Sequence, residues 1–169
     1  TYNEVTVTTA KQTLVVNAGV TVKKLIIKGG NVEIYGIVEE LVRENGNVEI
    51  VEVASFEAAS IKTVTNPEHF KFTSTWDGIS QIEATNGNIY TAAQLAYYQS
   101  KIAPNNVNYQ SLPVTLTAGT TTLYTDVDLA NKPWLGMVIN GNTFDGNNHT
   151  IKNLNMSQYI MNLSLIHIS

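Results

Sequence analysis

The sequence contains no cysteine, so disulfide bonds and thiolate metal sites are excluded. Charge is also scarce, because Asp, Glu, Lys and Arg together make up 14% of the 169 residues. The net charge is −4 and the basic residues do not cluster, which argues against nucleic acid as a partner. No apolar run approaches the roughly 20 residues that a membrane-spanning helix needs, so we expect no membrane span.

Thr, Asn and Val are abundant instead, and this composition favours strands and turns over helices. The apolar fraction of 43% and a mean hydropathy of −0.04 are typical of a folded, water-soluble chain. The length fits one ordinary domain or two small repeat modules.

An internal repeat of sixteen residues occupies 21–52. The string GNVEI occurs at 30–34 and again at 46–50. In each copy the two apolar residues alternate with Glu, which is the pattern of a strand, and Gly-Gly or Asn-Gly marks a corner. If each copy is one coil of a solenoid, Val32 and Ile34 stack on Val48 and Ile50 of the next coil. The alternative is a pair of β-hairpins in an antiparallel sheet.

Charged residues follow the same step. Three lysines each lie sixteen residues before a glutamate, at Lys23 and Glu39, Lys24 and Glu40, and Lys28 and Glu44. Stacked coils would place each pair one strand apart, about 4.8 Å. One like-charged pair, Glu33 over Glu49, opposes this register, so three favourable pairs against one favour the stacked solenoid.

The segment 91–103 is the one predicted helix. Thr91 is a suitable N-cap with Gln94 as its capping-box partner, and Pro104 would end the helix. A short helix before a run of strands suggests a cap over the open end of a β-helix.

These patterns predict a mainly β fold, made of right-handed parallel β-helix or β-solenoid modules with one short capping helix. Turn signals around Trp76 place a module boundary there. We expect a solenoid repeat module over 1–75 and a helix-capped second β-helix over 76–162. In the second module, short alternating strands are expected at the apolar residues Val114, Leu116, Leu123, Val127, Leu129, Val138, Phe144, Ile151 and Leu154.

The second half resembles a known family. The strings IYTAAQLA (89–96), LYTDVDLA (123–130) and NTFDGNNHTIKNL (142–154) appear in that order, with Trp134 before the last. Together they resemble the segment that opens the β-helix of large secreted and surface adhesin-like proteins of gut-type bacteria, many of which carry GLUG repeats. The resemblance covers about 89–156.

Two departures from the family pattern occur: Asn148 stands where the family mostly has Gly, and WLGMVIN (134–140) replaces Trp-x-Pro-Ile-Gly. No GLUG repeat is present, so the function of those repeats does not carry over. The resemblance implies export and a long repetitive scaffold, and it implies no catalytic residue.

The stretch from Asp145 to His149 could be a catalytic cluster or a turn. Asp, Gly and two Asn form a strong turn sequence, because these residues tolerate left-handed backbone and bond their own main chain. We interpret the stretch as a turn, with His149 pointing outward or bonded to a local carbonyl.

Three residues remain as candidates for binding. Asp126 and Asp128 are two apart, so on a strand they share one face, where paired carboxylates can serve acid/base chemistry or bind a cation. Trp134 could stack on a sugar ring. Because the single Arg lies far away at position 43 and six oxygen ligands for calcium are not seen, an exposed strand face is the simpler interpretation. We predict no catalytic residue, metal site or cofactor.

The function that these observations favour is a non-enzymatic, secreted or cell-surface β-helix scaffold, adhesin-like, with glycans or host surface proteins as partners. The alternative is the N-terminal part of a β-helix polysaccharide lyase or glycoside hydrolase whose active coils lie beyond residue 169. Further repeats in the full-length gene would support the first.

The last seven residues, LSLIHIS (163–169), are expected to be non-native. Back-translated as CTG TCT CTT ATA CAC ATC TCC, they read through the mosaic end of a common transposase library adapter. The alternative is a real strand, since the apolar residues alternate tolerably. On this interpretation the chain is a bacterial, metagenomic fragment of a longer protein, with native sequence ending near Asn162.

Overall fold

A computed structural model describes residues 1–44, 49–99, 101–102, 111–112, 119–137 and 143–156. The tail at 163–169 and the predicted strand residues Val114, Leu116 and Val138 lie outside the described residues.

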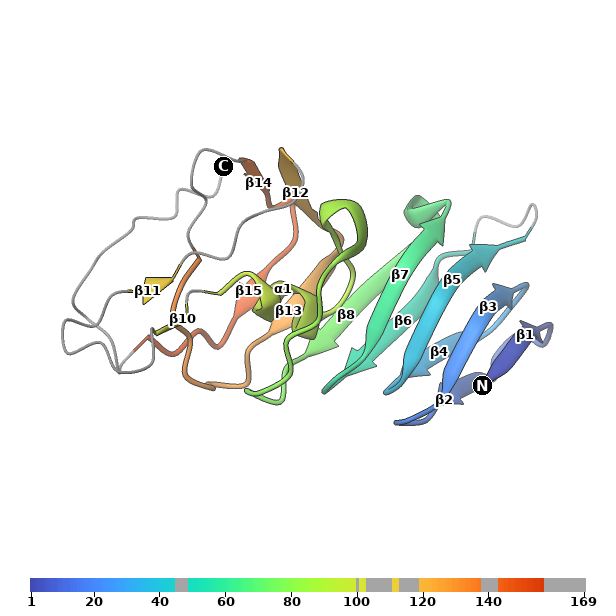
Figure 1. Cartoon of the computed structure of the whole chain (residues 1–169). Coiled ribbons are helices and arrows are strands. Elements are labelled where there is room, and N and C mark those ends of the chain that lie inside the picture. The colour runs from blue at the N-terminus through green and yellow to red at the C-terminus, as the bar shows by residue number, and fades with distance from the viewer. Residues whose placement is uncertain (45–48, 100, 103–110, 113–118, 138–142, 157–169) are drawn as a thin grey trace.

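The chain forms a mainly β solenoid of about six turns, whose stacked coils build three parallel sheets (Figure 1). This confirms the predicted fold class. A four-stranded sheet contains β1 (Tyr2–Val7), β3 (Thr21–Ile27), β5 (Ile37–Arg43) and β7 (Ser60–Thr65). A six-stranded sheet runs through β2 (Thr13–Val16), β4 (Asn31–Ile34), β6 (Val51–Phe56), β8 (Phe70–Thr75), β13 (Thr125–Asp128) and β15 (Ile151–Lys152). The third contains β9 (Asn88–Ile89), β12 (Thr120–Leu123) and β14 (Thr143–Asp145).

Three short helices and one antiparallel pair of strands complete the described elements. The 3-10 helices η1 (Pro67–His69) and η2 (Thr85–Gly87) lie at corners, and α1 (Ala92–Tyr97) follows β9. The strands β10 (Lys101–Ile102) and β11 (Ser111–Leu112) pair antiparallel. None of the helices in the described ranges is long and apolar enough to span a membrane.

The sixteen-residue register is correct for one face of the repeat. Strands β3 and β5 pair in parallel, with Val22 beside Val38 and Leu25 beside Leu41. All four side chains are buried, because stacking them excludes water from the solenoid interior. The antiparallel-hairpin alternative is therefore wrong for this region.

The same register is wrong for the other face. Val32 of β4 pairs with Val53 of β6, and Ile34 pairs with Ser55, so the step here is longer. β5 ends at Arg43 and β6 begins only at Val51, a longer interval than that from β3 to β4, and Ile50 is 61% exposed instead of stacked on Ile34. In the observed register Val51 and Val53 of β6 are buried, so burial of apolar surface decides the register and the repeated GNVEI string does not.

The predicted charge ladder forms in part. Lys28 and Glu44 make an ion pair at 3.0 Å, and Lys24 lies beside Glu40 in the ladder. Glu39 instead pairs with Lys62 of the following coil, at 3.3 Å. The unfavourable contact expected for Glu33 does not form, since its ladder neighbour is Ala54.

Two hydrophobic clusters fill the interior, and the change from one to the other occurs near Trp76. The first is mostly aliphatic, and the second contains Trp76, Trp134 and the apolar face of α1. Strand β13 nevertheless pairs directly with β8, so the six-stranded sheet runs across the predicted boundary. The division into two modules stays a prediction.

Helix α1 is shorter than expected and does not extend to 103. Tyr98 is its C-cap, and Lys101–Ile102 belongs to a strand. The predicted capping box is confirmed: Thr91 Oγ1 accepts from the Gln94 amide at 3.3 Å, and Gln94 Oε1 accepts from the Thr91 amide at 3.1 Å.

The position of α1 explains what it caps. Gln94 Nε2 donates to the Ile61 carbonyl at 2.7 Å, and Thr91 Oγ1 donates to the Ala59 carbonyl at 2.7 Å. Both carbonyls lie at the β7 edge of the four-stranded sheet. The helix therefore covers this edge within the solenoid, where an unpaired strand would otherwise leave buried carbonyls without donors.

Candidate functional site

The outer face of the six-stranded sheet carries the two candidate aspartates. Along β13, Thr125 and Val127 are buried, while Asp126 and Asp128 point outward, as predicted for residues two apart on a strand. They lie beside Thr73 and Thr75 of β8 in the ladder.

These residues line an open groove of about 400 Å³, here called the outer groove. Its walls come from three consecutive strands of one sheet and the residue before the last of them: Thr73, Ser74, Thr75, Asp126, Val127, Asp128, Thr150 and Lys152. Hydroxyl, carboxylate and ammonium groups thus share one surface.

Asp126 is fixed by the following coil. Its Oδ1 accepts from the Thr150 amide at 3.0 Å and lies 3.2 Å from His149 Nδ1. Partial burial raises the pKa of Asp126, but the hydrogen bonds from Thr150 and His149 outweigh it, and the net pKa is below the usual value.

Asp128 is fixed in the same way. Its Oδ1 accepts from Asn153 Nδ2 at 2.8 Å and from the Ala130 amide at 2.8 Å, and Lys152 Nζ lies 3.4 Å from Oδ2. The hydrogen bond from Asn153, followed by that from the Ala130 amide, lowers the pKa of Asp128. Both carboxylates are therefore ionised at neutral pH.

The stretch from Asp145 to His149 is a turn, as expected. Asn147 and Asn148 have positive φ angles of 46° and 59°, and Asp145 Oδ1 accepts from the Asn147 amide at 2.9 Å. The left-handed backbone at Asn148 explains why Gly or Asn suits this position.

The prediction for the His149 side chain was incomplete. Its backbone amide bonds the local Gly146 carbonyl at 2.8 Å, but its ring bonds Asp126 on the preceding coil. The sequence offered no signal for this contact, because the two residues are 23 apart and meet only once β13 and β15 stack.

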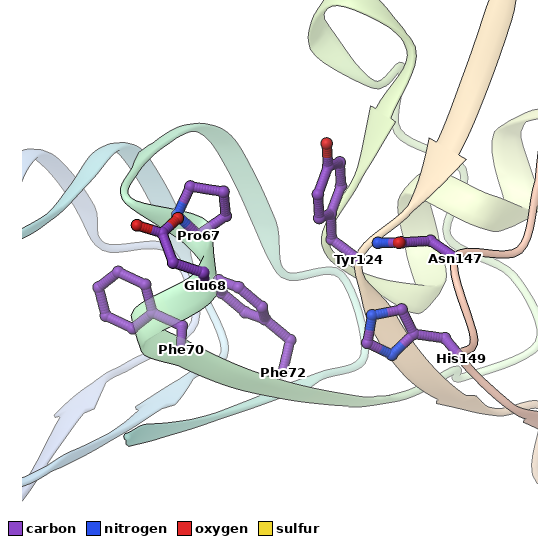
Figure 2. Close-up of a pocket in the computed structure, with 7 residues that line it drawn as sticks. All are labelled: Pro67, Glu68, Phe70, Phe72, Tyr124, Asn147 and His149. Carbon is purple, nitrogen blue, oxygen red and sulfur yellow. The ribbon is translucent and has the colours of Figure 1, made fainter. Parts of the chain in front are cut away.

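A second hollow, of about 250 Å³, opens beside His149 and is here called the aromatic pocket (Figure 2). One side comes from η1 and β8, and the other comes from the β12–β13 junction and the Asn147 turn. Its lining residues are Pro67, Glu68, Phe70, Phe72, Tyr124, Asn147 and His149. Sequence reasoning missed this site, since its residues come from three distant segments.

Four aromatic rings connect the pocket to the core. Ring centroids lie 5.6 Å apart for Phe70 and Phe72, 5.4 Å for Phe72 and Tyr90, and 5.1 Å for Tyr90 and Tyr124. Burial, with a smaller effect of Tyr124, raises the pKa of Tyr90 to about 12, so its hydroxyl stays neutral. The pocket wall is therefore an extension of the packed interior.

Trp134 is not at the surface. It is 4% exposed and packs edge-on against Trp76, with ring centroids 5.5 Å apart. Its place in the second hydrophobic cluster makes it a core residue, which leaves no open ring face for a sugar.

Within the part of the chain that the structure describes, no group of three or more His, Asp or Glu side chains is placed to hold a metal ion. The groove offers fixed hydrogen-bond donors and acceptors, and the pocket offers aromatic walls. In comparisons with protein families, with curated proteins and with solved structures, no significant match to the chain was found.

Proposed function

We propose that this chain is a non-enzymatic β-solenoid scaffold of a secreted or cell-surface protein, and that its outer groove binds extended glycans. The observation that carries the proposal is the row of polar side chains along one flat sheet face, from Thr73 and Thr75 to Asp126 and Asp128. The adhesin-like resemblance of residues 89–156 supports the surface location.

The chemistry of the groove suits sugar hydroxyls. Thr75 Oγ1 can donate or accept, the Asp128 carboxylate accepts, and Lys152 donates. Neighbouring strands repeat such groups about every 4.8 Å along the solenoid axis. A chain of sugar rings running along the axis would meet one set of partners per coil.

The state of the carboxylates argues against glycoside hydrolysis in this groove. A general acid must keep its proton near neutral pH, which requires a raised pKa. Asp126 and Asp128 both have lowered pKa values, and their hydrogen bonds already occupy Oδ1. The pair is thus suited to accepting hydrogen bonds from a ligand and not to protonating one.

Binding of the purified chain to an array of extended glycans tests the proposal. The double variant Asp128→Asn with Thr75→Ala removes two groove partners, and we expect affinity for any bound glycan to fall roughly tenfold or more. Glu33→Gln on β4 of the same sheet, outside the groove, is the control and should bind as the wild type does. Equal binding to every glycan, or cleavage of the bound glycan, would contradict the proposal.

A further inference from the structure

The aromatic pocket differs chemically from the outer groove. Among its seven lining residues are three aromatic side chains, one imidazole and one carboxylate, and none is Lys or Arg. The basic residues Lys71 and Lys152 act on Asp126 and Asp128. The pocket lining therefore combines aromatic rings with one carboxylate and has no Lys or Arg.

The aromatic rings at the pocket are not parallel and do not form one platform. Phe70 and Phe72 are tilted by 39° to each other, and Phe72 is tilted by 52° to Tyr90. Tyr124 stands on the opposite side of the opening from Phe70 (Figure 2). A sugar ring needs one flat exposed face, whereas a compact cation is attracted by several ring faces at different angles.

Polar groups at the rim favour a positive ligand. Glu68 lies on the η1 side, with its side chain 65% exposed and Oε1 3.7 Å from His69 Nε2. His149 lies on the other side, and its ring Nδ1 lies 3.2 Å from the Asp126 carboxylate. The Asn147 side chain is directed toward Tyr124 and the opening (Figure 2).

We propose that the aromatic pocket binds an organic ammonium group, of the quaternary or N-alkylated kind. The half-buried ring of Tyr124 supplies cation–π attraction, the buried Phe70 and Phe72 close the apolar wall, and Glu68 supplies a counter-charge at the rim. The pocket volume of about 250 Å³ limits the ligand to a single head group. This proposal does not rest on glycan binding by the outer groove.

The test compares choline with 3,3-dimethylbutan-1-ol, which has the same shape and no charge, by NMR titration of the full chain. We expect choline to shift the resonances of residues around the pocket, and the neutral alcohol to bind more weakly by roughly 3- to 30-fold. Equal binding of the two compounds would reduce the site to an apolar hollow and overturn the proposal, as would binding of neither.

Variants refine the same test. Tyr124→Leu should abolish the preference for choline, while Tyr124→Phe should keep it, because a phenyl ring retains the π face without the hydroxyl. Glu68→Gln should weaken choline and leave the alcohol unchanged, and Glu33→Gln should change neither. Loss of choline binding in Tyr124→Phe would overturn the cation–π assignment.

The glycan array on the Asp128→Asn and Thr75→Ala variant is read separately, so failure of one proposal is distinguishable from failure of the other.

Discussion

The coils before Trp76 and the coils after it fill one continuous solenoid interior in different ways. Before Trp76 the interior is a stack of Val, Leu and Ile in register, such as Leu25 on Leu41. After it, the interior holds two tryptophans, a buried helix and a buried amide, Gln94. The difference teaches that the same stacking can be specified either by apolar repetition or by individual polar contacts.

Coil length explains why the second part needs these contacts. Val22 and Val38 are neighbours in the ladder at a step of sixteen residues. Phe72 of β8 and Thr125 of β13 are also ladder neighbours, but the segment between them is much longer and includes α1. After this long intervening segment, the chain must rejoin the six-stranded sheet in one register. The hydrogen bonds of Gln94 and Thr91 to the β7 edge fix where it returns.

The largest expected effect is at Trp134, because its ring fills the space against Trp76 in the second cluster. Trp134→Ala should lower the free energy of unfolding by about 3–5 kcal/mol, measured by urea denaturation. Trp134→Phe, which keeps a ring, should cost clearly less. If Trp134→Ala leaves stability unchanged, the second cluster is not packed as described.

Gln94→Ala is expected to come next. The side chain is fully buried, and its removal leaves the Ile61 carbonyl and the Tyr90 and Thr91 amides without their partner. Unsatisfied buried groups of this kind cost about 1–3 kcal/mol. Differential scanning calorimetry should show the loss.

Gln94→Glu separates the two roles of the side chain, since a carboxylate still accepts from the amides but cannot donate to Ile61. It should therefore remain destabilised. Stability equal to the wild type would mean that the bond to the β7 edge contributes nothing.

Much of the first part could be predicted from the sequence because its register depends on repetition. The pairing of Val22 with Val38 and the ion pair of Lys28 with Glu44 followed from a constant step. The prediction failed at Val32, since the segment between β5 and β6 is longer than the repeat allows, and the step exceeds sixteen both from β4 to β6 and from β5 to β7. The repeated GNVEI string does not reveal which residues of the following strand are buried, and burial sets the register.

The candidate site was less predictable, because it depends on contacts between coils. Asp126 and Asp128 were found from their alternation on a strand, and the Thr91 capping box was found from local spacing. The contact of His149 with Asp126 requires knowing which coil stacks on β13. Trp134 was misplaced because an aromatic residue between two turns carries no pattern that tells core from surface.

Charge reversal tests the regular part with a smaller effect. Lys24 lies between Glu4 and Glu40 in adjacent strands, so Lys24→Glu places three like charges in one row. We expect a loss of about 0.5–1 kcal/mol in the free energy of unfolding. Adding Glu40→Lys should restore only part of it, because Glu4 still faces a like charge.

The coupling energy from this double-mutant cycle is the decisive quantity. A measurable favourable coupling confirms the sixteen-residue step between β3 and β5 in solution. Zero coupling at low salt would show that the two side chains do not interact across β3 and β5.

The smallest expected effect concerns pH and the outer groove. The pKa values of Asp126 and Asp128 in the folded chain are lower than the ordinary value of 3.8, so the folded state favours their ionised forms. Their contribution to stability is therefore fully present above pH 3.8 and is lost as the pH falls through the folded-state pKa values. Because both groups are partly exposed, the contribution is at most about 1 kcal/mol.

In the double variant Asp126→Asn with Asp128→Asn, the free energy of unfolding measured by urea denaturation should change less steeply with pH below 3.8 than in the wild type. An unchanged slope would mean that the following coil, through Thr150 and Asn153, does not hold the two carboxylates in solution.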